Sequence, residues 1–353
     1  MAIFYDAPVE PDALTTVVKN VPTPSGNKLS ELFPTEYKSD NTIDWSEIVR
    51  KNRTASYRTW DGRFAGSERD GGSPKRVKLA PLGSSIGMGE YERLQLEFAK
   101  YGGTFVEKLV DAIYNDAEKL TTEVLNRIEL AWGDVLLDGK LTINENGYND
   151  EADYGLPGNH VATASTLWSD TTNAKPLTDL QAWSDTWVDT NGGGAPGKAL
   201  TSRKIIRLML KNKEVIDAMF GATAGRTSVS LSQLNGLLEE HGLPVMLPAY
   251  DTKLHVVNPE TGVGADTRVL PDNRMILLPD NLRDLGYMAY GLSATALELL
   301  DAKKTDFSFE ESAGIVGVVI KDGPPFRQYT YVDAVGQPVL EDAKQLFVST
   351  VSA

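Results

Sequence analysis

Cysteine is missing from all 353 residues, and its absence excludes several kinds of chemistry at once. Without a thiol the chain can form no disulfide framework, no thiolate zinc site, no iron–sulfur cluster and no cysteine nucleophile. Histidine is nearly as scarce, since only His160, His241 and His255 occur and no two of them form an H-x-x-x-H pair. A histidine metal site would need them to converge through tertiary folding, so we expect His241 at a helix end on the surface and the others in strands or loops.

Long apolar runs are also missing. No stretch approaches the roughly 18 consecutive apolar residues that cross a bilayer. The first ten residues carry two acids, no base and no apolar segment of the kind that a secretory signal requires. We therefore expect a soluble chain, made in a cytoplasm, with no membrane partner.

An excess of basic residues is absent as well. The 35 lysines and arginines face 49 aspartates and glutamates, and the net charge of −14 argues against binding of nucleic acid over a broad basic surface. With 41% apolar residues the composition is that of a folded protein, and a chain of this length should bury roughly three quarters of its extended surface. Residues 50–80 are the exception, because they hold nine bases against three acids, a local charge of +6 that leaves −20 on the remainder.

The N-terminal residues, 1 to about 44, contain five prolines and scattered apolar residues without a sustained period. Proline fixes its own backbone and restricts the residue before it, so the pattern predicts an extended arm. The arm is too apolar for a solvated tail, and we expect it to pack on something, which could be another subunit. Its apolar residues are Phe4, Tyr5, Leu29, Leu32, Phe33 and Tyr37.

The basic segment reads as a long β-hairpin. Alternating stretches at Thr54–Trp60 and Lys75–Leu79 flank a turn cluster at Gly66–Pro74. Such a hairpin could bind nucleic acid through its aromatic residues, could be a solvated decoration, or could clasp the acidic face of a neighbouring copy. We favour the clasp, because opposite charges on identical chains explain both halves of the charge distribution and produce head-to-tail contacts that close into rings.

The strongest periodic signal runs from Glu90 to about Leu136, with an interruption at Gly102–Gly103. Beyond the glycines, apolar residues recur every three or four positions and predict one amphipathic helix of about 45 Å. Polar residues 141–175 suggest short strands and loops. Helical patterns then cover Thr178–Thr190, Ser202–Phe220 and Ser230–His241, and strand candidates follow at Pro244–Leu247, Leu254–Val257, Met275–Leu278, Ile315–Ile320, Tyr329–Val332 and Leu346–Val351. The layout predicts an α+β fold.

A partial phosphate-loop motif, G-x-x-x-x-G-K, is formed by Gly192, Gly197 and Lys198. Ala199 stands where Ser or Thr would ligate magnesium, and the preceding segment is helical where a strand is required. We expect a flexible glycine-rich loop, with nucleotide hydrolysis as a minor alternative.

No other motif indicates catalysis. The acidic stretch Asn144–Asp153 lacks the register of an EF-hand, so a solvated loop is favoured over a calcium site. There is also no G-x-S-x-G nucleophile elbow. We expect a protein that is not an enzyme and has no cofactor or metal.

The order of arm, hairpin, long helix and α+β region resembles the Hong Kong 97-type bacteriophage capsid fold, and the sequence resembles the lambda-type major capsid protein family (the phage capsid E family). Two patches carry the second resemblance: Ile128–Lys140 (IELAWGDVLLDGK) running into Leu141-Thr142-Ile143, and Val269–Pro279 (VLPDNRMILLP). The resemblance implies an N-terminal arm at 1–49, an extended loop at 50–82, a peripheral domain with the spine helix at 83–175, an axial domain at 176–325, and a return to the peripheral region at 326–353.

The resemblance also implies a function. We expect the major capsid protein of a tailed bacteriophage, assembled in the bacterial host cytoplasm into hexamers and pentamers of an icosahedral virion shell around double-stranded DNA. Scaffolding, portal and decoration proteins are further expected partners. The alternative is a carbohydrate- or solute-binding module that stacks ligands on Trp168, Trp183 and Trp187. The residues expected at intersubunit contacts are Arg53, Arg58, Trp60, Arg63, Lys75, Arg76 and Lys78 in the loop and Phe4, Tyr5, Phe33 and Tyr37 on the arm.

Overall fold

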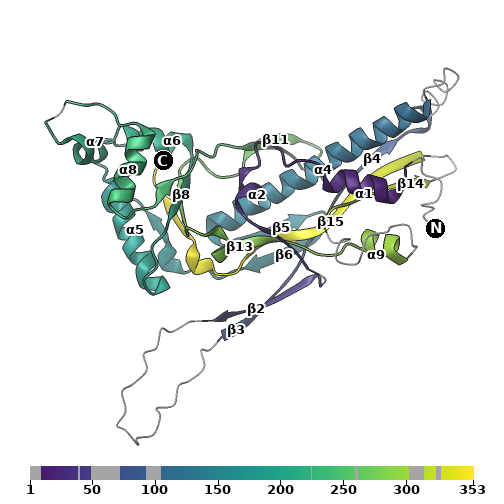
Figure 1. The fold of residues 1–353 in the computed structure, drawn as a ribbon, viewed down its shortest axis with the longest axis horizontal. Helices are drawn as coiled ribbons and strands as arrows, with labels where there is room; N and C mark the ends of the chain where they lie inside the picture. Colours follow the sequence, from purple (N-terminus) through teal and green to yellow (C-terminus); the bar gives the residue numbers. More distant parts are fainter. Residues whose placement is uncertain are drawn as a thin grey trace, which may run out of the picture.

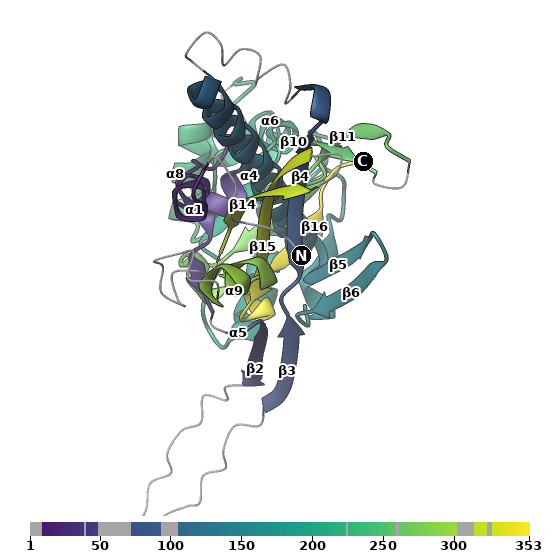
Figure 2. The ribbon, with the colours of Figure 1, turned by 90° about the vertical axis from the view of Figure 1, so that its right-hand side faces the viewer.

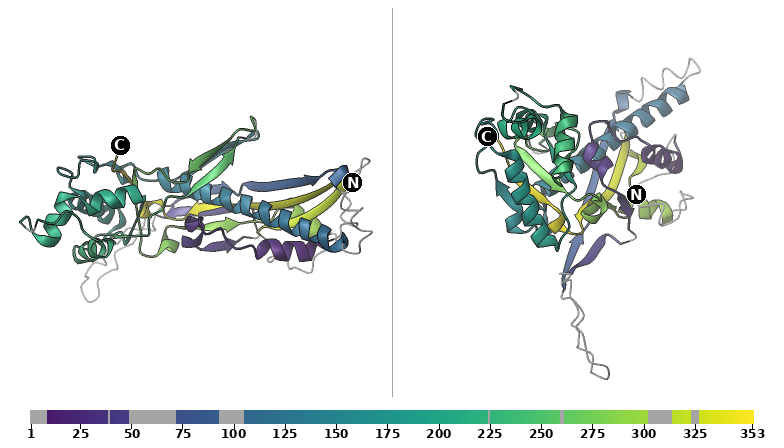
Figure 3. Two further views of the ribbon diagram at one scale, coloured as in Figure 1. Left: turned by 90° about the horizontal axis from the view of Figure 1, so that it is seen from above. Right: turned by 60° about the vertical axis from the view of Figure 1, so that its left-hand side comes forward.

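The computed structural model describes residues 9–38, 40–48, 72–92, 105–223, 225–258, 261–301, 314–322 and 327–353. The molecule is elongated, with a long helix and a sheet toward one end and a group of shorter helices at the other (Figures 1 and 3). Helices and strands are mixed along the chain, as an α+β fold requires.

The long helix is α4 (Phe105–Asp138), whose 34 residues extend about 50 Å at 1.5 Å per residue. Its apolar residues at three- and four-residue spacing, such as Ile113, Leu120 and Ile128, are almost completely buried. The helix ends where Gly139 takes a positive φ of 71°. A Cβ on Gly139 would lie 2.6 Å from the Cβ of Leu156, so both backbone conformation and close packing require glycine there. The predicted long helix is confirmed.

The larger sheet is built around one long strand. Its strands are β1 (Thr35–Tyr37), β4 (Pro81–Met88), β13 (Gly286–Tyr290), β14 (Val316–Asp322) and β15 (Arg327–Leu340). The first half of β15 pairs antiparallel with β14 on one side and β4 on the other, and its second half pairs antiparallel with β13. Strand β1 joins β13 in parallel. Helix α4 packs along β15 and β4, which forms the first hydrophobic core.

A second sheet separates this core from another. Its order is β7 (Val161–Thr163), β16 (Phe347–Thr350), β12 (Arg274–Leu278), β8 (Lys198–Thr201) and β9 (Val245–Met246). Along β12, Ile276 and Leu278 belong to the first core while Met275 and Leu277 belong to the second. Because successive side chains of a strand point to opposite faces, this one sheet contributes to both cores.

Four helices enclose the second core: α5 (Pro176–Asn191), α6 (Arg203–Leu210), α7 (Lys213–Phe220) and α8 (Leu231–Glu240). The predicted helix Ser202–Phe220 is in fact two helices. The side chain of Asn212 accepts hydrogen bonds from the backbone N–H groups of Glu214 and Val215, which caps α7 and ends the continuity.

Three two-stranded hairpins extend from these layers. They are β2 (Thr42–Ile48) with β3 (Gly72–Lys78), β5 (Lys140–Glu145) with β6 (Tyr148–Asp153), and β10 (Lys253–Val257) with β11 (Gly264–Arg268). The β2–β3 hairpin points away from the body of the molecule (Figures 1 and 2). The predicted strand Lys75–Leu79 therefore exists, but it pairs with Thr42–Ile48, and the predicted strand Thr54–Trp60 lies outside the described residues.

The N-terminal segment is not the uniformly extended arm that its prolines suggested. It contains α1 (Pro11–Lys19) and α2 (Lys28–Leu32). Pro11 is tolerated because it occupies the first turn of α1, where its missing N–H has no helical partner to lose. Helix α1 packs on β14, and its Leu14 and Val18 are buried there.

The remaining short elements are the helix α9 (Ala294–Asp301) and the 3-10 turns η3 (Gly158–His160), η4 (Leu282–Asp284) and η5 (Ala343–Gln345).

Candidate intersubunit surfaces

Strand β3 presents two basic side chains to solvent. Arg76 and Lys78 are exposed, whereas Val77 between them is buried together with Ile43 of β2. Lys75 lies opposite Trp45 in the same pairing. Because side chains alternate along a strand, Arg76 and Lys78 lie on the same outward face of the hairpin.

The base of this hairpin is fastened to the body by Asn41. Its side-chain amide donates to the carbonyl of Leu292 at 2.8 Å, and its carbonyl oxygen accepts from the Leu292 N–H at 2.8 Å. A Cβ on Gly291 would lie 2.2 Å from that oxygen, so glycine is needed for the approach. This double hydrogen bond fixes where the hairpin leaves the molecule.

Tyr37 and Phe33, both expected at intersubunit contacts, have opposite environments. Tyr37 is 62% exposed, and one face of its ring stacks on Tyr290 at 5.8 Å. Phe33 is 3% exposed and stacks on Trp132 at 3.9 Å, inside the first core. The expectation for Phe33 is therefore wrong, because α4 of its own chain already covers the ring.

Charged neighbours flank Tyr37. Lys38 donates to Glu36 at 2.6 Å, and Arg283 also binds the Glu36 carboxylate. The hydrogen bond from Lys38 lowers the pKa of Glu36, and the same bond raises the pKa of Lys38. The expected contact residues Phe4, Tyr5, Arg53, Arg58, Trp60 and Arg63 lie outside the described residues.

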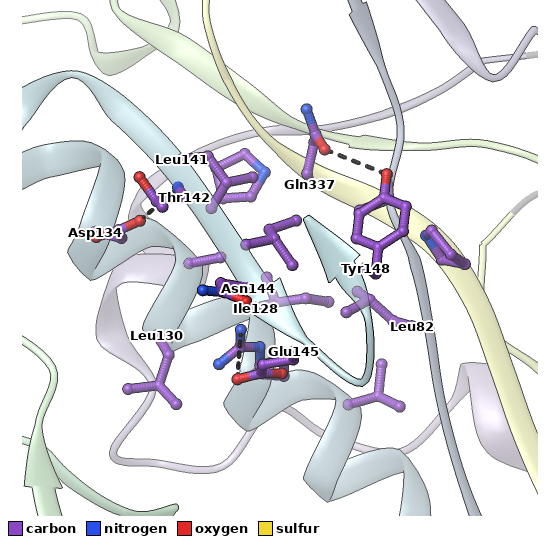
Figure 4. Close-up of a pocket in the computed structure, with 18 of the residues that line it drawn as sticks. Leu82, Ile128, Leu130, Asp134, Leu141, Thr142, Asn144, Glu145, Tyr148 and Gln337 are labelled. Carbon is purple, nitrogen blue, oxygen red and sulfur yellow. Dashed lines mark hydrogen bonds and ion pairs between the residues drawn. The ribbon is translucent and has the colours of Figure 1, made fainter. Parts of the chain in front are cut away.

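A groove of about 960 Å³ lies between α4, the start of β4 and the β5–β6 hairpin (Figure 4). Its apolar lining includes Leu82, Ile128 and Leu130, and two partly exposed apolar residues, Tyr148 and Val257, also contribute.

The charged side chains that line this groove are mostly acidic: Glu123, Asp134 and Glu145 against Arg127 alone. Arg127 binds Glu145 at 3.0 Å, and Asp134 accepts from the backbone N–H of Thr142 at 2.9 Å. The groove combines an apolar lining with excess negative charge.

The adjoining hairpin extends the negative surface. Strand β6 exposes Asp150, Glu151 and Asp153. Lys140 contacts Asp153 at 3.0 Å and Glu151 at 3.2 Å, and the hydrogen bond to Asp153 raises the pKa of Lys140. The stretch expected to be a solvated loop is thus a β-hairpin with an acidic, exposed strand.

The motifs that suggested other functions have structural roles. Gly192 caps α5 in the left-handed conformation, and Lys198 donates to the carbonyl of Asp280 at 2.6 Å. A Cβ on Gly197 would lie 2.7 Å from the Cβ of Asp280. This loop closes a helix and starts a strand, which leaves the nucleotide alternative without support.

The tryptophans of the carbohydrate-binding alternative are core residues. Trp168, Trp183 and Trp187 are 0%, 7% and 1% exposed. The indole N–H of Trp168 donates to Asp179 at 2.9 Å. That alternative is wrong, because a stacking platform must face solvent.

The histidines do not form a common site. The Nδ1 of His160 hydrogen-bonds the carbonyl of Leu346 at 2.8 Å, and that of His255 meets Asp266 at 2.9 Å. His241 is the exposed C-cap of α8, as expected. In the part of the chain that the structure describes, no three His, Asp or Glu side chains lie close enough to hold a metal ion. None of the helices within those same residues has the length and hydropathy to cross a membrane.

Sequence reasoning identified the basic strand but missed the groove. The walls of the groove come from residues 80–84, residues 123–148, Val257 with Val269, and residues 336–338, which are far apart in the chain. The one available signal was the density of acids in residues 145–153, where four of nine residues are acidic.

Comparison with known proteins places these features in a family. The sequence matches the Phage major capsid protein E family over residues 10–303. The structure superposes with a TM-score of 0.62 on a protein assigned as a prophage capsid protein of Escherichia coli CFT073, at 15% identity, covering 98% of this chain and 99% of the other.

Two weaker structural likenesses are to phage capsids. The capsid of Myoviridae phage XM1 has a TM-score of 0.45 at 10% identity, covering 88% of this chain and 86% of the other. The cyanophage A-1(L) capsid asymmetric unit has a TM-score of 0.47 at 14% identity, covering 94% of this chain and 93% of the other. A search of the curated proteins found none with significant similarity.

The fold is that of a virion shell protein of the Hong Kong 97 type. The chain belongs to the Phage major capsid protein E family, which confirms the resemblance seen in the sequence. It is the structural, non-enzymatic major capsid protein of a tailed phage, and it associates with itself in the icosahedral shell of the virion.

Proposed function

We propose that copies of this chain form hexamers and pentamers in which the basic β2–β3 hairpin of one copy lies over the acidic groove of the next. The observation that carries this proposal is the separation of charge: a hairpin with exposed Arg76 and Lys78 extends away from a body whose groove is lined by three carboxylates and one guanidinium (Figure 2). Opposite patches on identical chains favour head-to-tail contacts, which close into rings.

The two sides of the contact also match in their apolar character. The groove has an apolar lining, and Tyr148 and Val257 at the groove are 37% and 53% exposed in the single chain. The segment between β2 and β3 includes Tyr57, Trp60 and Phe64 among its arginines. Aromatic residues with surrounding bases are the combination that contributes most to protein interfaces.

We propose that the division of the chain follows the same capsid plan. Residues 1–49 form an arm, 50–82 the extended loop, 83–175 a peripheral domain around α4, 176–325 an axial domain, and 326–353 a return to the peripheral region. Two observations support the boundary at residue 176: α5 begins at Pro176, and helices α5 to α8 enclose a core distinct from that of α4. Strands β13 and β14, which these bounds count with the axial domain, pair with β15 in the sheet that packs on α4. A shell with an acidic balance would enclose double-stranded DNA without holding its phosphates. Scaffolding, portal and decoration proteins are proposed further partners.

Charge reversal in the hairpin tests the clasp. We expect a variant with Arg53, Arg58, Arg76 and Lys78 all replaced by Glu to remain folded by circular dichroism but to lose rings and shells in negative-stain electron microscopy and light scattering. The matched control replaces four exposed bases away from the hairpin, Lys28, Lys119, Lys175 and Lys253, with Glu, and it should assemble as the wild type does. Normal shells from the hairpin variant would contradict the proposal.

A further inference from the structure

Helix α6 carries a basic ridge on an acidic protein. Ile205, Ile206 and Met209 of this helix are buried in or beside the second core. The exposed positions of the helix and its C-cap are Arg203, Lys204, Arg207 and Lys211, which we call the α6 ridge. Every exposed residue of the helix is therefore basic, although the whole chain has a net charge of −14.

The chain itself leaves half of this ridge without ion pairs. Arg203 lies 3.8 Å from Asp251, and Lys204 lies 3.5 Å from Asp272. Arg207 and Lys211 form no ion pair with any described residue. Arg203 and Lys204 in the first turn oppose the helix dipole, whereas Arg207 in the last turn and Lys211 at the C-cap are favourable to it, so the dipole explains only half of the ridge.

An acidic stripe lies on the other flank of the same group of helices. Helix α7 packs against both α5 and α6, and α5 lies on the far side of the group from α6 (Figures 1 and 2). The solvent-facing side of α5 carries Asp185 and Asp189, which form no ion pair with any described residue. We call these two residues the α5 stripe.

The ridge and the stripe have the same spacing. Asp185 and Asp189 are four residues apart, as are Arg203, Arg207 and Lys211. Four residues of an α-helix span about 6 Å, so the charges of two facing helices can pair in register. The two surfaces are complementary, exposed and on opposite flanks, which is the arrangement that a head-to-tail contact between identical subunits requires.

We propose that the α6 ridge of one copy binds the α5 stripe of the next copy around the ring. This inference rests on the proposed assembly into hexamers and pentamers and names a second contact in it, separate from the hairpin and groove. A nucleic-acid backbone is the less suitable partner for the ridge, because Asp251 and Asp272 lie beside it and would repel phosphate.

Charge exchange tests the contact. One variant carries Arg207→Glu and Lys211→Glu, which makes the half of the ridge without ion pairs acidic, like the stripe. A second carries Asp185→Lys and Asp189→Lys, which makes the stripe basic, like the ridge. We expect each variant alone to need about a tenfold higher concentration than wild type for half assembly, measured by light scattering at low salt. All four substitutions in one chain should restore assembly, because the pair is then reversed but complementary.

A mixture of the two variants gives the sharpest result. Since each contact must join an acidic flank to a basic one, the two chains must alternate around a ring. Alternation closes with six members but not with five, so electron microscopy should show six-membered rings, tubes or sheets and no closed shells. The chain with all four substitutions should form closed shells, because it needs no partner of the other kind.

Other results would overturn the inference. If the wild type assembles and both variants assemble equally well alone, the ridge and stripe do not meet, while the proposed capsomers remain supported. If the ridge variant assembles normally but retains less double-stranded DNA in a filter-binding assay than the wild type does, the ridge binds DNA phosphates and not a neighbouring subunit. A wild type that remains monomeric under the same conditions would contradict the proposed formation of hexamers and pentamers by this chain alone. The variant with Lys28→Glu and Lys253→Glu controls for the net charge of the ridge variant, since each pair of substitutions changes it by −4.

Discussion

Glu129 is a completely buried carboxylate on α4 that joins three parts of the chain. Its Oε1 accepts from the N–H of Leu29 at 2.9 Å and the hydroxyl of Tyr250 at 2.6 Å. Its Oε2 accepts from the N–H and the hydroxyl of Ser30, at 2.8 and 2.7 Å. Burial is the main cause that raises the pKa of Tyr250, with the adjacent carboxylate adding to it, so the phenol stays protonated and donates. Four donors satisfy the buried charge and hold the N-terminal segment against the long helix.

Replacing Glu129 by Ala should therefore be costly. Four buried donors would lose their acceptor, and we expect a loss of about 3 to 5 kcal/mol in the free energy of unfolding, measured by urea denaturation of the unassembled chain. Glu129→Gln should lose less, because its carbonyl oxygen still accepts. Glu118→Ala, at an exposed position of the same helix, should change the value by under about 0.5 kcal/mol. If the Glu118 and Glu129 variants lose equal amounts of unfolding free energy, Glu129 does not hold the N-terminal segment on α4.

His160 gives the stability of the second core a pH dependence. Its ring is completely buried, lies beside Trp187 and Phe347, and has no partner for Nε2 among the described residues. Burial lowers its pKa below the ordinary 6.5. Below that ordinary value the unfolded chain binds a proton that the folded chain resists, so stability is complete above about pH 6.5 and falls as the pH decreases.

We expect His160→Gln to weaken this dependence by up to about 1.4 kcal/mol per pH unit below 6.5, measured by urea denaturation from pH 8 to pH 5. The exposed His241→Asn should leave the dependence unchanged. If the His160 substitution leaves the slope of stability against pH unchanged, groups other than His160 cause the pH dependence.

At the scale of elements, patterns that extend over many residues predicted the structure best. The long amphipathic repeat predicted α4, and the helical pattern of Ser230–His241 predicted α8, whose first turn is closed by a capping box of Ser230 and Gln233. Patterns that depend on tertiary context failed. The strand β13 has no alternation to detect, because all five of its residues are buried on both faces. The partner of β3 was misassigned because strand pairing depends on contacts between distant segments, and the groove was missed for the same reason.

Glycines in helices show the same dependence on context. A Cβ on Gly133 of α4 would lie 2.5 Å from the carbonyl oxygen of Val269, whereas one on Gly236 of α8 would meet nothing within 4 Å. Gly133→Ala should therefore destabilise the chain by about 1 to 3 kcal/mol through overpacking. Gly236→Ala should stabilise it by about 0.5 to 1 kcal/mol, because alanine loses less backbone freedom in a helix. Thermal unfolding of both variants measures the change in stability that each substitution causes. If both substitutions stabilise the chain, or both destabilise it, the close approach of α4 to Val269 is contradicted.

At the scale of the whole molecule, the two cores share one sheet. Strand β12 lies in its middle, paired with β16 and β8, and its side chains alternate between the cores. Neither core can lose this strand without exposing the other. The expected consequence is that the two cores unfold together, although each is packed around helices of its own.

Adjacent residues on β12 test this coupling. Ile276→Ala opens a cavity in the first core and Leu277→Ala one in the second, and each should cost about 2 to 5 kcal/mol. Because the sheet is common to both cores, each variant should unfold in one transition, with the same midpoint by far-ultraviolet circular dichroism and by tryptophan fluorescence. Leu297→Ala, at a position 43% exposed, should shift the midpoint far less. A separate early transition in the Leu277 variant alone would show that the helical group unfolds independently, and that the shared sheet does not couple the cores.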